Sequence, residues 1–216
     1  MADVPVDLFA AVPQAELRSA GQLRTFATGE VVMHRGDEGA MLHRVERGRF
    51  ASQVVTPMGD VATLAVHGPG EVVGLLAALR PGLHRTATVV ALEPARTLAI
   101  GAESFARLRA SHTEVARAAE QVLIDLLIAT NDRLVEALYE PAPGRVRARL
   151  RALGDIYRAE PGISTVTIPL SQEHLAGLAG TTRETVNRVL REEVDRGCLV
   201  LSRRRITVDL NLLRPG

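Results

Sequence analysis

Residues 170–200 read LSQEHLAGLAGTTRETVNRVLREEVDRGCLV, and this stretch decides the fold of the C-terminal third of the chain. Ser171 is a good N-cap for a first short helix, and Gly180 supplies the turn that ends it. The run Thr181–Glu184 matches the S/T-x-x-E pattern that begins a second helix. Two short helices joined by a glycine turn predict a helix-turn-helix.

The second helix has one apolar and one polar face. The apolar side chains recur with helical spacing and are expected to form a buried stripe of Val186, Val189, Leu190 and Val194. The polar side chains near the N-terminus are Arg183, Glu184, Asn187 and Arg188. In a helix-turn-helix, the N-terminal residues of the second helix lie against base edges in the major groove. Because arginine pairs with guanine and glutamate accepts from the cytosine amino group, this face predicts sequence-specific binding of double-stranded DNA.

A basic hairpin is expected after the second helix, from Cys198 to Val208, with three consecutive arginines near its tip. Residues 141–216 hold 13 arginines against eight acidic residues, whereas residues 1–140 hold 13 against 17. A basic third on an acidic remainder favours a polyanionic partner. The alternative is an ordinary helix pair with a solvated charged face. The residues expected to contact DNA are Arg183, Glu184, Asn187, Arg188, Ser171, Gln172, Thr182, Arg203 and Arg204.

The region from about Phe26 to Ile100 has the pattern of short strands. Eleven of the 18 glycines lie between Gly21 and Gly101. The expected strands are residues 30–34, 41–46, 50–56, 61–66, 86–92 and 96–100. Short strands with glycine-rich turns predict a small β-sandwich, barrel or roll. The segment GLLAAL, residues 74–79, is instead a candidate for a short helix.

Beyond Ile100 the hydrophobic pattern becomes helical. We expect a short helix at 104–110, a long helix at 112–139 and another helix at 145–159. The long helix carries two apolar stripes, one of Ala119, Val122, Leu126 and Ala129 and one of Leu123, Leu127, Thr130, Leu134 and Ala137. One stripe can pack on the β domain, and the other predicts contact with the same helix of a second subunit, hence a homodimer. The alternative is a helix buried within one monomer.

The run Pro141–Gly144 is expected to end the long helix and to mark a domain boundary. The predicted domains are a β domain over 1–111, which the family resemblance given below makes an effector-sensing β-roll, a dimerisation helix and hinge over 112–140, and a DNA-binding domain over 141–216. Short strands at 165–168, 198–201 and 206–209 are expected around the helix-turn-helix.

Several classes of protein are not favoured by the composition. The single cysteine, Cys198, excludes a disulfide framework within the chain and a cysteine-rich metal cluster. The histidines do not have the spacing of a helical metal pair, and no nucleophile–base set or phosphate-binding loop is present. We therefore expect no enzyme activity, no catalytic or metal-binding residue and no required cofactor. The first twenty residues do not form a signal peptide and no apolar run spans a bilayer, so we expect a soluble cytoplasmic protein without a membrane partner.

These features together resemble the catabolite activator protein (CRP/FNR) family of bacterial transcription regulators. The resemblance rests on residues 170–200, above all the R-E-T-V-x-R signature at Arg183–Arg188, and it covers nearly the whole chain. It implies an α+β fold with an N-terminal β-roll of the cyclic-nucleotide-binding type, a long dimerisation helix and a C-terminal winged helix-turn-helix. It also implies that Arg183, Glu184 and Arg188 read a GTGA-like half-site of an inverted repeat. The loop 161–167 corresponds to a surface through which some relatives touch RNA polymerase.

The same resemblance implies an effector site in the β-roll. Gly74 would start a phosphate-binding helix, and Arg85 and Thr86 follow eleven residues later, as in members that bind cyclic AMP. An arginine, a hydroxyl and free backbone N–H groups at a helix N-terminus suit a phosphodiester. Thr130 and Asn131 match the positions that contact adenine in such members.

One residue departs from that pattern. Leu75 stands where the family has a glutamate that holds the ribose hydroxyl, and a buried hydroxyl without its partner costs about 1–3 kcal/mol. Cyclic AMP or a related nucleotide is thus a candidate effector, and the alternative is a silenced or repurposed pocket, with DNA binding that needs no cyclic nucleotide. Arg85 would then form a salt bridge and Thr130 with Asn131 an interhelical hydrogen bond. Two other classes stay open, a cyclic-nucleotide-binding signalling subunit and a nonspecific DNA-binding protein.

Overall fold

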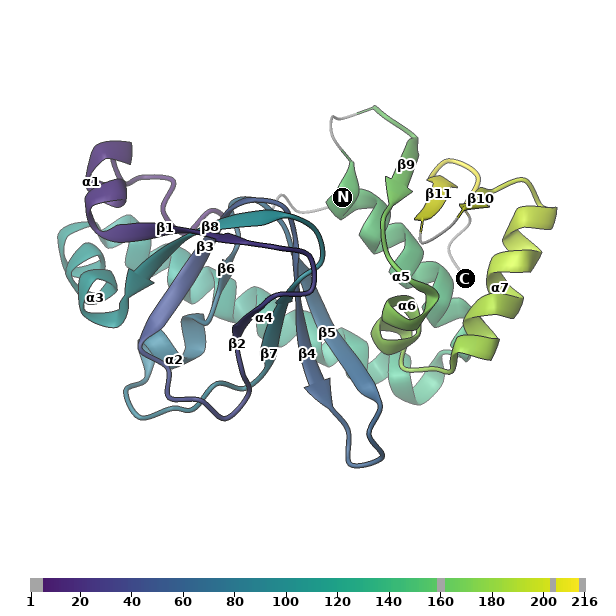
Figure 1. Ribbon diagram of the computed structural model, residues 1–216, viewed down its shortest axis with the longest axis horizontal. Coiled ribbons are helices and arrows are strands. Elements are labelled where there is room, and N and C mark those ends of the chain that lie inside the picture. The colour runs from purple at the N-terminus through teal and green to yellow at the C-terminus, as the bar shows by residue number, and fades with distance from the viewer. Residues whose placement is uncertain (1–5, 159–161, 203–204, 214–216) are drawn as a thin grey trace. The chain divides into compact units, whose positions relative to one another are not determined.

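The computed structural model describes residues 6–158, 162–202 and 205–213. The expected phosphate contacts Arg203 and Arg204 lie outside these residues. The chain divides into two compact units, one of residues 1–54 and 65–130 and the other of residues 55–64 and 131–216. The helices and strands of both units are labelled in Figure 1.

Eight strands build the N-terminal β-roll. They are β1 (Gly21–Phe26), β2 (Val31–Met33), β3 (Met41–Arg47), β4 (Phe50–Val55), β5 (Val61–His67), β6 (Val72–Val73), β7 (Thr88–Ala91) and β8 (Ala95–Gly101). They form two four-stranded sheets, in the orders β1-β8-β3-β6 and β2-β7-β4-β5. The six expected strands are confirmed with small shifts at their ends, whereas the sequence pattern does not predict β1 and β6.

A core of apolar side chains joins the two sheets. Phe26 on β1 and Phe50 on β4 meet edge to face, with ring centroids 5.7 Å apart. The cluster also contains Met33, Val45, Val73, Val89, Ala91 and Ala95, so every one of these strands except β5 contributes to it. Alternate residues of β3 and β8 face away from this core and serve a second one.

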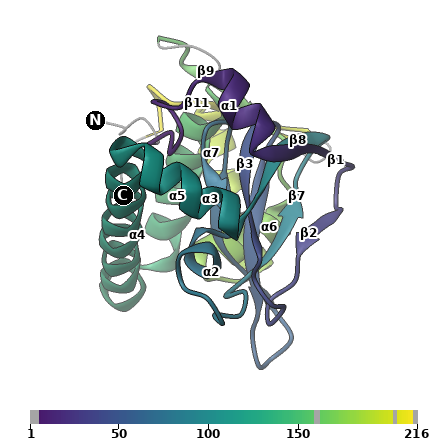
Figure 2. The ribbon, with the colours of Figure 1, turned by 90° about the vertical axis from the view of Figure 1, so that its left-hand side faces the viewer.

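The second core lies between the β1-β8-β3-β6 sheet and three helices, α1 (Gln14–Ser19), α3 (Ala102–Ser111) and α4 (Thr113–Tyr139) (Figure 2). Leu42, Leu98 and Ile100 of the sheet pack there with Phe105 of α3 and Val115 of α4. A further helix of this region, α2 (Leu75–Leu79), confirms the expected short helix at 74–79. Only the first three turns of α4 take part in this core, since its last members are Val122 and Leu123.

A histidine is buried in the core of the roll. His43 is 4% exposed, and its Nδ1 lies 3.0 Å from the Thr97 hydroxyl oxygen. Burial lowers the pKa of His43 to about 4, and the positive charges of Arg85 and Arg24 add to this effect. The imidazole is therefore neutral in the folded protein at neutral pH.

The β-roll is expected to lose stability in mild acid through His43. The unfolded histidine, with a pKa of 6.5, takes up a proton before the folded one does. The free energy of unfolding therefore falls as the pH drops from about 6.5 to about 4, by about 3 kcal/mol. Urea denaturation followed by circular dichroism at several pH values measures this loss. A His43→Gln variant lacks the titrating group, so its profile should stay flatter over this range; parallel profiles would contradict the assignment.

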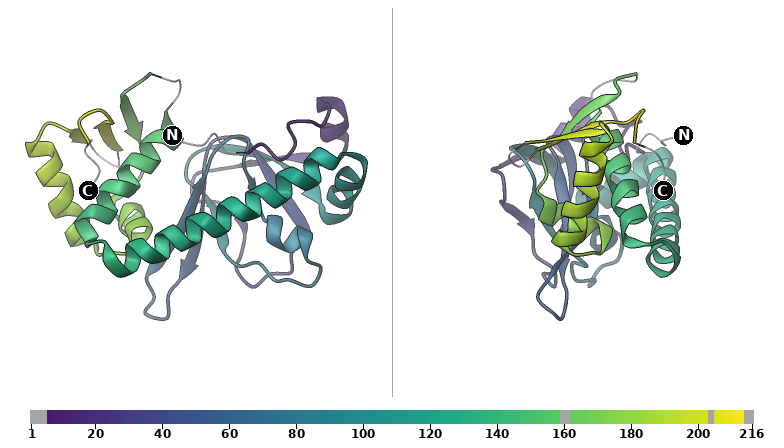
Figure 3. Two further views of the ribbon diagram at one scale, coloured as in Figure 1. Left: turned by 180° about the vertical axis from the view of Figure 1, so that it is seen from behind. Right: turned by 90° about the vertical axis from the view of Figure 1, so that its right-hand side faces the viewer.

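Helix α4 is a single uninterrupted helix that contributes residues to both units (Figure 3). It ends at Tyr139, and α5 (Ala142–Tyr157) begins three residues later. The prediction that this helix starts at Arg145 is wrong. Pro143 fits in the first turn of α5, because the backbone N–H groups of a first turn have no partner within the helix and the N–H that proline lacks is not needed there. In the part of the chain that the structure describes, no helix is long and apolar enough to cross a membrane.

The C-terminal unit contains a three-helix core and a small sheet. Its elements after α5 are β9 (Thr165–Ile168), α6 (Gln172–Ala179), α7 (Arg183–Asp195), β10 (Leu199–Ser202) and β11 (Arg205–Asp209), with the strands in the order β10-β11-β9. Fully or almost fully buried side chains of α5, α6 and α7 meet in the core, namely Val146, Leu150, Leu153, Leu175, Val186, Val189 and Leu190. The expected helix pair and the three strands are confirmed.

Candidate nucleic-acid interface

The turn between α6 and α7 is built from local capping interactions. The Ser171 hydroxyl accepts from the backbone N–H of His174 at 3.2 Å, as expected for the N-cap of α6. Gly180 ends α6 with φ of 58°, in the left-handed region that glycine adopts without strain. The N-cap of α7 is Thr182, whose hydroxyl accepts from the N–H of Thr185 at 3.3 Å. The sequence pattern, which begins one residue earlier at Thr181, is corrected by one position.

Helix α7 presents the expected polar side chains at its N-terminal end. Arg183, Glu184 and Arg188 are exposed and Asn187 is half-buried, while Val186, Val189 and Leu190 are buried beneath them. The expectation that Val194 is buried is wrong. It lies in the last turn of α7 and is exposed, whereas the neighbouring Glu193 of the same turn is buried against Arg147 of α5.

Hydrogen bonds at the start of α7 favour the charged form of Glu184. The pKa of the exposed Glu184 carboxyl lies below its ordinary value, because its own backbone N–H and then the Thr182 hydroxyl donate to it, with Arg183 nearby. Glu184 is therefore an acceptor at neutral pH. The guanidinium of Arg188 pairs with Glu192 at 3.1 Å in an exposed i, i+4 bridge of little energetic weight, so it is free to exchange this partner.

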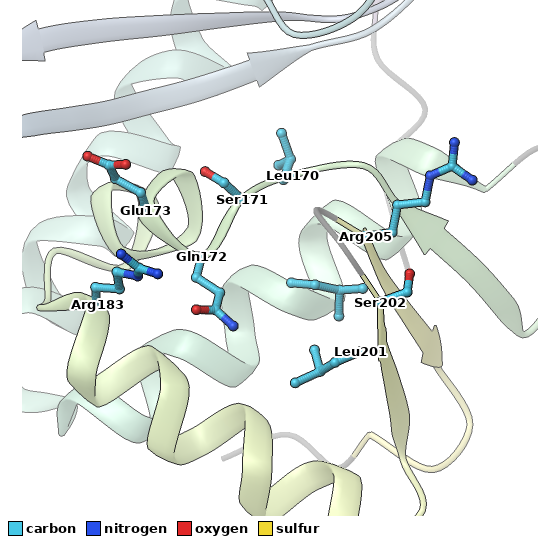
Figure 4. Close-up of a pocket in the computed structure, with 9 residues that line it drawn as sticks. Leu170, Ser171, Gln172, Glu173, Arg183, Leu201, Ser202 and Arg205 are labelled. Carbon is cyan, nitrogen blue, oxygen red and sulfur yellow. The ribbon is translucent and has the colours of Figure 1, made fainter.

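A groove of about 380 Å³ opens beside α7 (Figure 4). Ser171, Gln172 and Glu173 at the start of α6 and Arg183 at the start of α7 form one part of the lining, and Ser202 and Arg205 of the β10–β11 hairpin form another. Leu170, Leu201 and Ile206 complete the lining with apolar side chains. The structure thus brings together the expected residues Ser171, Gln172 and Arg183.

Three polar residues of this groove are not among the predicted DNA contacts, namely Glu173, Ser202 and Arg205. Arg205 belongs to the run of three arginines that indicates a wing, and Ser202 precedes that run directly. The run is therefore a usable signal for both. No sequence signal points to Glu173, because a carboxylate is not expected beside DNA phosphates.

A buried ion-pair network holds α7 against α5. The Glu193 carboxylate is almost fully buried and accepts from Arg147 Nε at 2.7 Å and from Arg196 at 2.9 Å. A second nitrogen of Arg147 pairs with Glu192 at 3.1 Å. Because a carboxylate buried in this way is stable only with its partners, the network fixes the position of α7 on α5.

Of the effector residues expected in the β-roll, Gly74 and Arg85 lie next to each other. Gly74 precedes α2 with φ of 84°, and an added Cβ would lie 2.5 Å from the Arg85 guanidinium. Arg85 is 7% exposed and donates to the carbonyl oxygens of Gly74, at 3.2 Å, and Met41. Burial lowers its pKa, and the Asp37 carboxylate partly offsets this. The salt bridge that the alternative reading expects is absent, since among the described residues no carboxylate lies within ion-pair distance of Arg85.

The other expected effector residues are arranged differently. Leu75 is buried in the core formed by the sheet and the helices, and Thr86 is exposed. Thr130 and Asn131 lie on exposed turns of α4, where the Thr130 hydroxyl donates to the Leu126 carbonyl at 2.7 Å. Among the described residues, no cluster of three or more histidine, cysteine, aspartate or glutamate side chains is arranged to hold a metal ion.

The second half of α4 carries an exposed apolar surface. Its members are Ile124, Leu126, Leu127, Ile128, Leu134, Val135, Leu138 and Tyr139. Ile124, Leu127, Asn131, Leu134 and Leu138 follow one another at intervals of three and four residues, the spacing of a heptad seam. The exposed stripe therefore differs from both expected stripes, because Ala119, Val122 and Leu123 pack in the core of the first unit.

Comparisons with known proteins match two separate parts of the chain. Residues 23–112 match the family profile of the cyclic nucleotide-binding domain, and residues 144–215 match that of the Crp-like helix-turn-helix domain. The chain is 30% identical over 185 residues to the cyclic AMP receptor protein of Thermus thermophilus, covering 83% of this chain and 80% of that protein.

Two further similarities extend over most of the chain. It is 28% identical over 184 residues to the CRP-like cAMP-activated global transcriptional regulator of Mycobacterium tuberculosis, covering 85% of this chain and 82% of that protein. The solved structure of FixK2 from Bradyrhizobium japonicum is similar with a TM-score of 0.78 at 19% identity, covering 89% of this chain and 95% of that one. At this identity the likeness shows the fold, and the predicted α+β architecture is confirmed.

Proposed function

This chain belongs to the catabolite activator protein (CRP/FNR) family of transcription regulators, and from this premise we propose that it is a homodimer that binds an inverted repeat of GTGA-like half-sites. The proposed base contacts are Arg183, Glu184 and Arg188, with Asn187 beside them. The proposed backbone contacts are Ser171, Gln172, Thr182, Arg203 and Arg204, with Arg205 and Ser202 of the same groove.

The observation that carries this proposal is the polar end of α7. Two exposed guanidinium groups and an ionised carboxylate lie within the first two turns of α7. The opposite, apolar face of this helix is buried in the core of the C-terminal unit. Arginine donates to guanine O6 and N7, and a carboxylate accepts from cytosine N4. The set thus matches the donors and acceptors of a G- and C-containing half-site.

The exposed apolar surface of α4 supports the dimer. A contiguous patch of large apolar side chains on one helix is rarely left in water. Heptad spacing suits the same helix of a second subunit, and Asn131 would lie within that seam. A two-fold dimer places its recognition helices in successive major grooves, about 34–36 Å apart, which requires an inverted repeat.

The proposed effector is cyclic AMP or a related nucleotide, held in the β-roll through Gly74, Arg85 and Thr86. Arg85 supports this, because its guanidinium is buried and, among the described residues, no carboxylate forms an ion pair with it, which favours a phosphate as partner. The name of the mycobacterial relative states that this relative is activated by cAMP. The proposal also includes a cytoplasmic location, RNA polymerase as a candidate partner and the domain limits 1–111, 112–140 and 141–216.

A second candidate is the same regulator with a pocket that no longer responds to cyclic nucleotide. Two observations favour it. Leu75 is part of the core, so this position offers no acceptor for a ribose hydroxyl. The Arg85 guanidinium already donates to the Gly74 and Met41 carbonyls, and a phosphate would have to replace these hydrogen bonds.

Fluorescence anisotropy of a palindromic GTGA-containing duplex, titrated with the protein at fixed salt with and without cyclic AMP, tests both candidates. If cyclic AMP strongly raises the affinity for this duplex, the protein is a ligand-gated regulator, as the first candidate states. Tight binding that the nucleotide does not change would favour the second candidate. Equal affinity for a scrambled duplex, falling steeply with salt, would indicate nonspecific binding and overturn the proposal. No binding to either duplex would favour a signalling subunit.

A further inference from the structure

Arg145 joins the ends of two helices. In the first turn of α5, its guanidinium donates through Nε to the Ala179 carbonyl at 2.9 Å and through a terminal nitrogen to the Gly180 carbonyl at 3.0 Å. The other terminal nitrogen donates to the Glu140 carbonyl at 2.7 Å. Ala179 and Gly180 form the end of α6, directly before the recognition helix α7, and Glu140 follows the last residue of α4.

The chemistry of these three acceptors explains why an arginine stands there. The last carbonyls of a helix have no partner within the helix, and they carry the negative end of the helix dipole. One guanidinium has donors enough for three of them and a charge that both helix ends favour. Lysine has a single nitrogen and lacks the planar arrangement of donors needed to bridge the two ends.

Two neighbouring contacts strengthen the α4–α5 junction. Arg149, one turn further along α5, forms an ion pair with Glu136 of α4. The Glu140 side chain lies over Gly144, so close that a Cβ at Gly144 would overlap it. These contacts tie α5 to α4, whereas the hydrogen bonds of Arg145 extend the connection to the turn that starts α7.

We infer that Arg145 is a positioning residue that sets the half-site spacing accepted by the DNA-bound dimer. This inference rests on the proposed function. In a dimer joined through α4, the distance between the two recognition helices depends on how each α7 is tied to the end of its own α4. Arg145 makes that connection through three hydrogen bonds. Without it the recognition helix keeps its fold and its base contacts, but its place relative to the dimer axis is less firmly fixed, because the remaining contacts of α5 with α4 and with α7 must hold it.

Duplexes that differ only in the spacing of two GTGA-like half-sites test the inference. Anisotropy titrations use the full-length wild type and the variants Arg145→Lys and Arg145→Gln, with spacers lengthened or shortened by one or two base pairs. One inserted pair moves a half-site by about 3.4 Å and rotates it by about 35°. The wild type should show a sharp optimum. Both variants should lose roughly 10-fold in affinity at the optimal spacer and little at the others, as expected for loss of charge-assisted hydrogen bonds.

Two controls separate positioning from stability. A Leu153→Ala variant opens a cavity in the core of the C-terminal unit, so its melting temperature should fall while its spacing optimum stays sharp. Binding to a duplex with one half-site should be the same for wild type and Arg145→Lys. An unchanged spacing profile in both Arg145 variants would overturn the inference about Arg145 but not the proposed function. A wild type without a spacing optimum would overturn the proposed dimeric function, and this inference with it.

Discussion

The double variant Arg183→Ala, Arg188→Ala is expected to lose sequence-specific DNA binding while it keeps its fold and its dimeric state. Each bidentate arginine–guanine pair contributes about 1–3 kcal/mol of discrimination. Loss of both should therefore lower the affinity for the GTGA-like repeat by roughly 30-fold to more than 10,000-fold. The fold should survive because both side chains are exposed and the Arg188–Glu192 pair is a surface bridge.

Competition titrations against a scrambled duplex measure this loss. The specific and nonspecific affinities of the double variant should become nearly equal, because phosphate contacts remain and base contacts do not. The control variant Arg18→Ala, Arg107→Ala removes the same charge from exposed sites outside the C-terminal unit. It should bind like the wild type. If the double variant discriminated between the two duplexes as well as the wild type does, α7 would not be the recognition helix.

The helix-turn-helix is predictable because its signals are local. Caps at Ser171 and at the threonine pair, a glycine at the turn and apolar residues at helical spacing all lie within 30 residues. The error of one residue at the cap of α7 has a simple origin. Threonine is a good cap at either position, the S/T-x-x-E pattern selects Thr181 because Glu184 follows it by three residues, and only the hydrogen bond from the Thr185 N–H shows that Thr182 is the cap.

The β-roll is predictable in outline, and the two strands that the pattern misses show why the outline is incomplete. β1 is an edge strand whose residues are mostly exposed, so it lacks the alternation of apolar and polar residues that marks a half-buried strand. β6 has two residues, fewer than any pattern can detect. Both are held by pairing with strands distant in the sequence, β8 and β3.

Sequence spacing reveals only one of the contacts that build the candidate sites. The eleven-residue interval places Gly74 beside Arg85, and the structure shows this hydrogen bond. The second acceptor of Arg85, the Met41 carbonyl, is 44 residues away. The acceptors of Arg145 in the helix-turn-helix are 34 and 35 residues away. Arginines of this chain look alike in sequence, and only tertiary structure separates those that bind carbonyls from those that face solvent.

The variant Leu127→Asp, Leu134→Asp is expected to convert the protein to a monomer and thereby to abolish tight binding to the inverted repeat. The two leucines are 62% and 58% exposed in the single chain. Burying what is exposed of four such side chains in a dimer contributes roughly 4–7 kcal/mol, and aspartate in their place adds repulsion between subunits. The dimer should therefore be undetectable at micromolar concentration in sedimentation equilibrium.

DNA binding by this monomer separates the role of α4 from that of α7. A single half-site should bind the variant as well as it binds one subunit of the wild type, because α7 is unchanged. The affinity of the variant for the full repeat should fall by a factor of about 10²–10⁴, because the gain that comes from linking two recognition helices is lost. The control Asp125→Arg changes the charge of α4 at a position that is not one of the five seam residues, and it should leave the dimer intact. If the variant with both leucines replaced still formed a stable dimer, the subunits would associate through another surface, and the connection from α4 through Arg145 to α7 could not set the spacing of the half-sites.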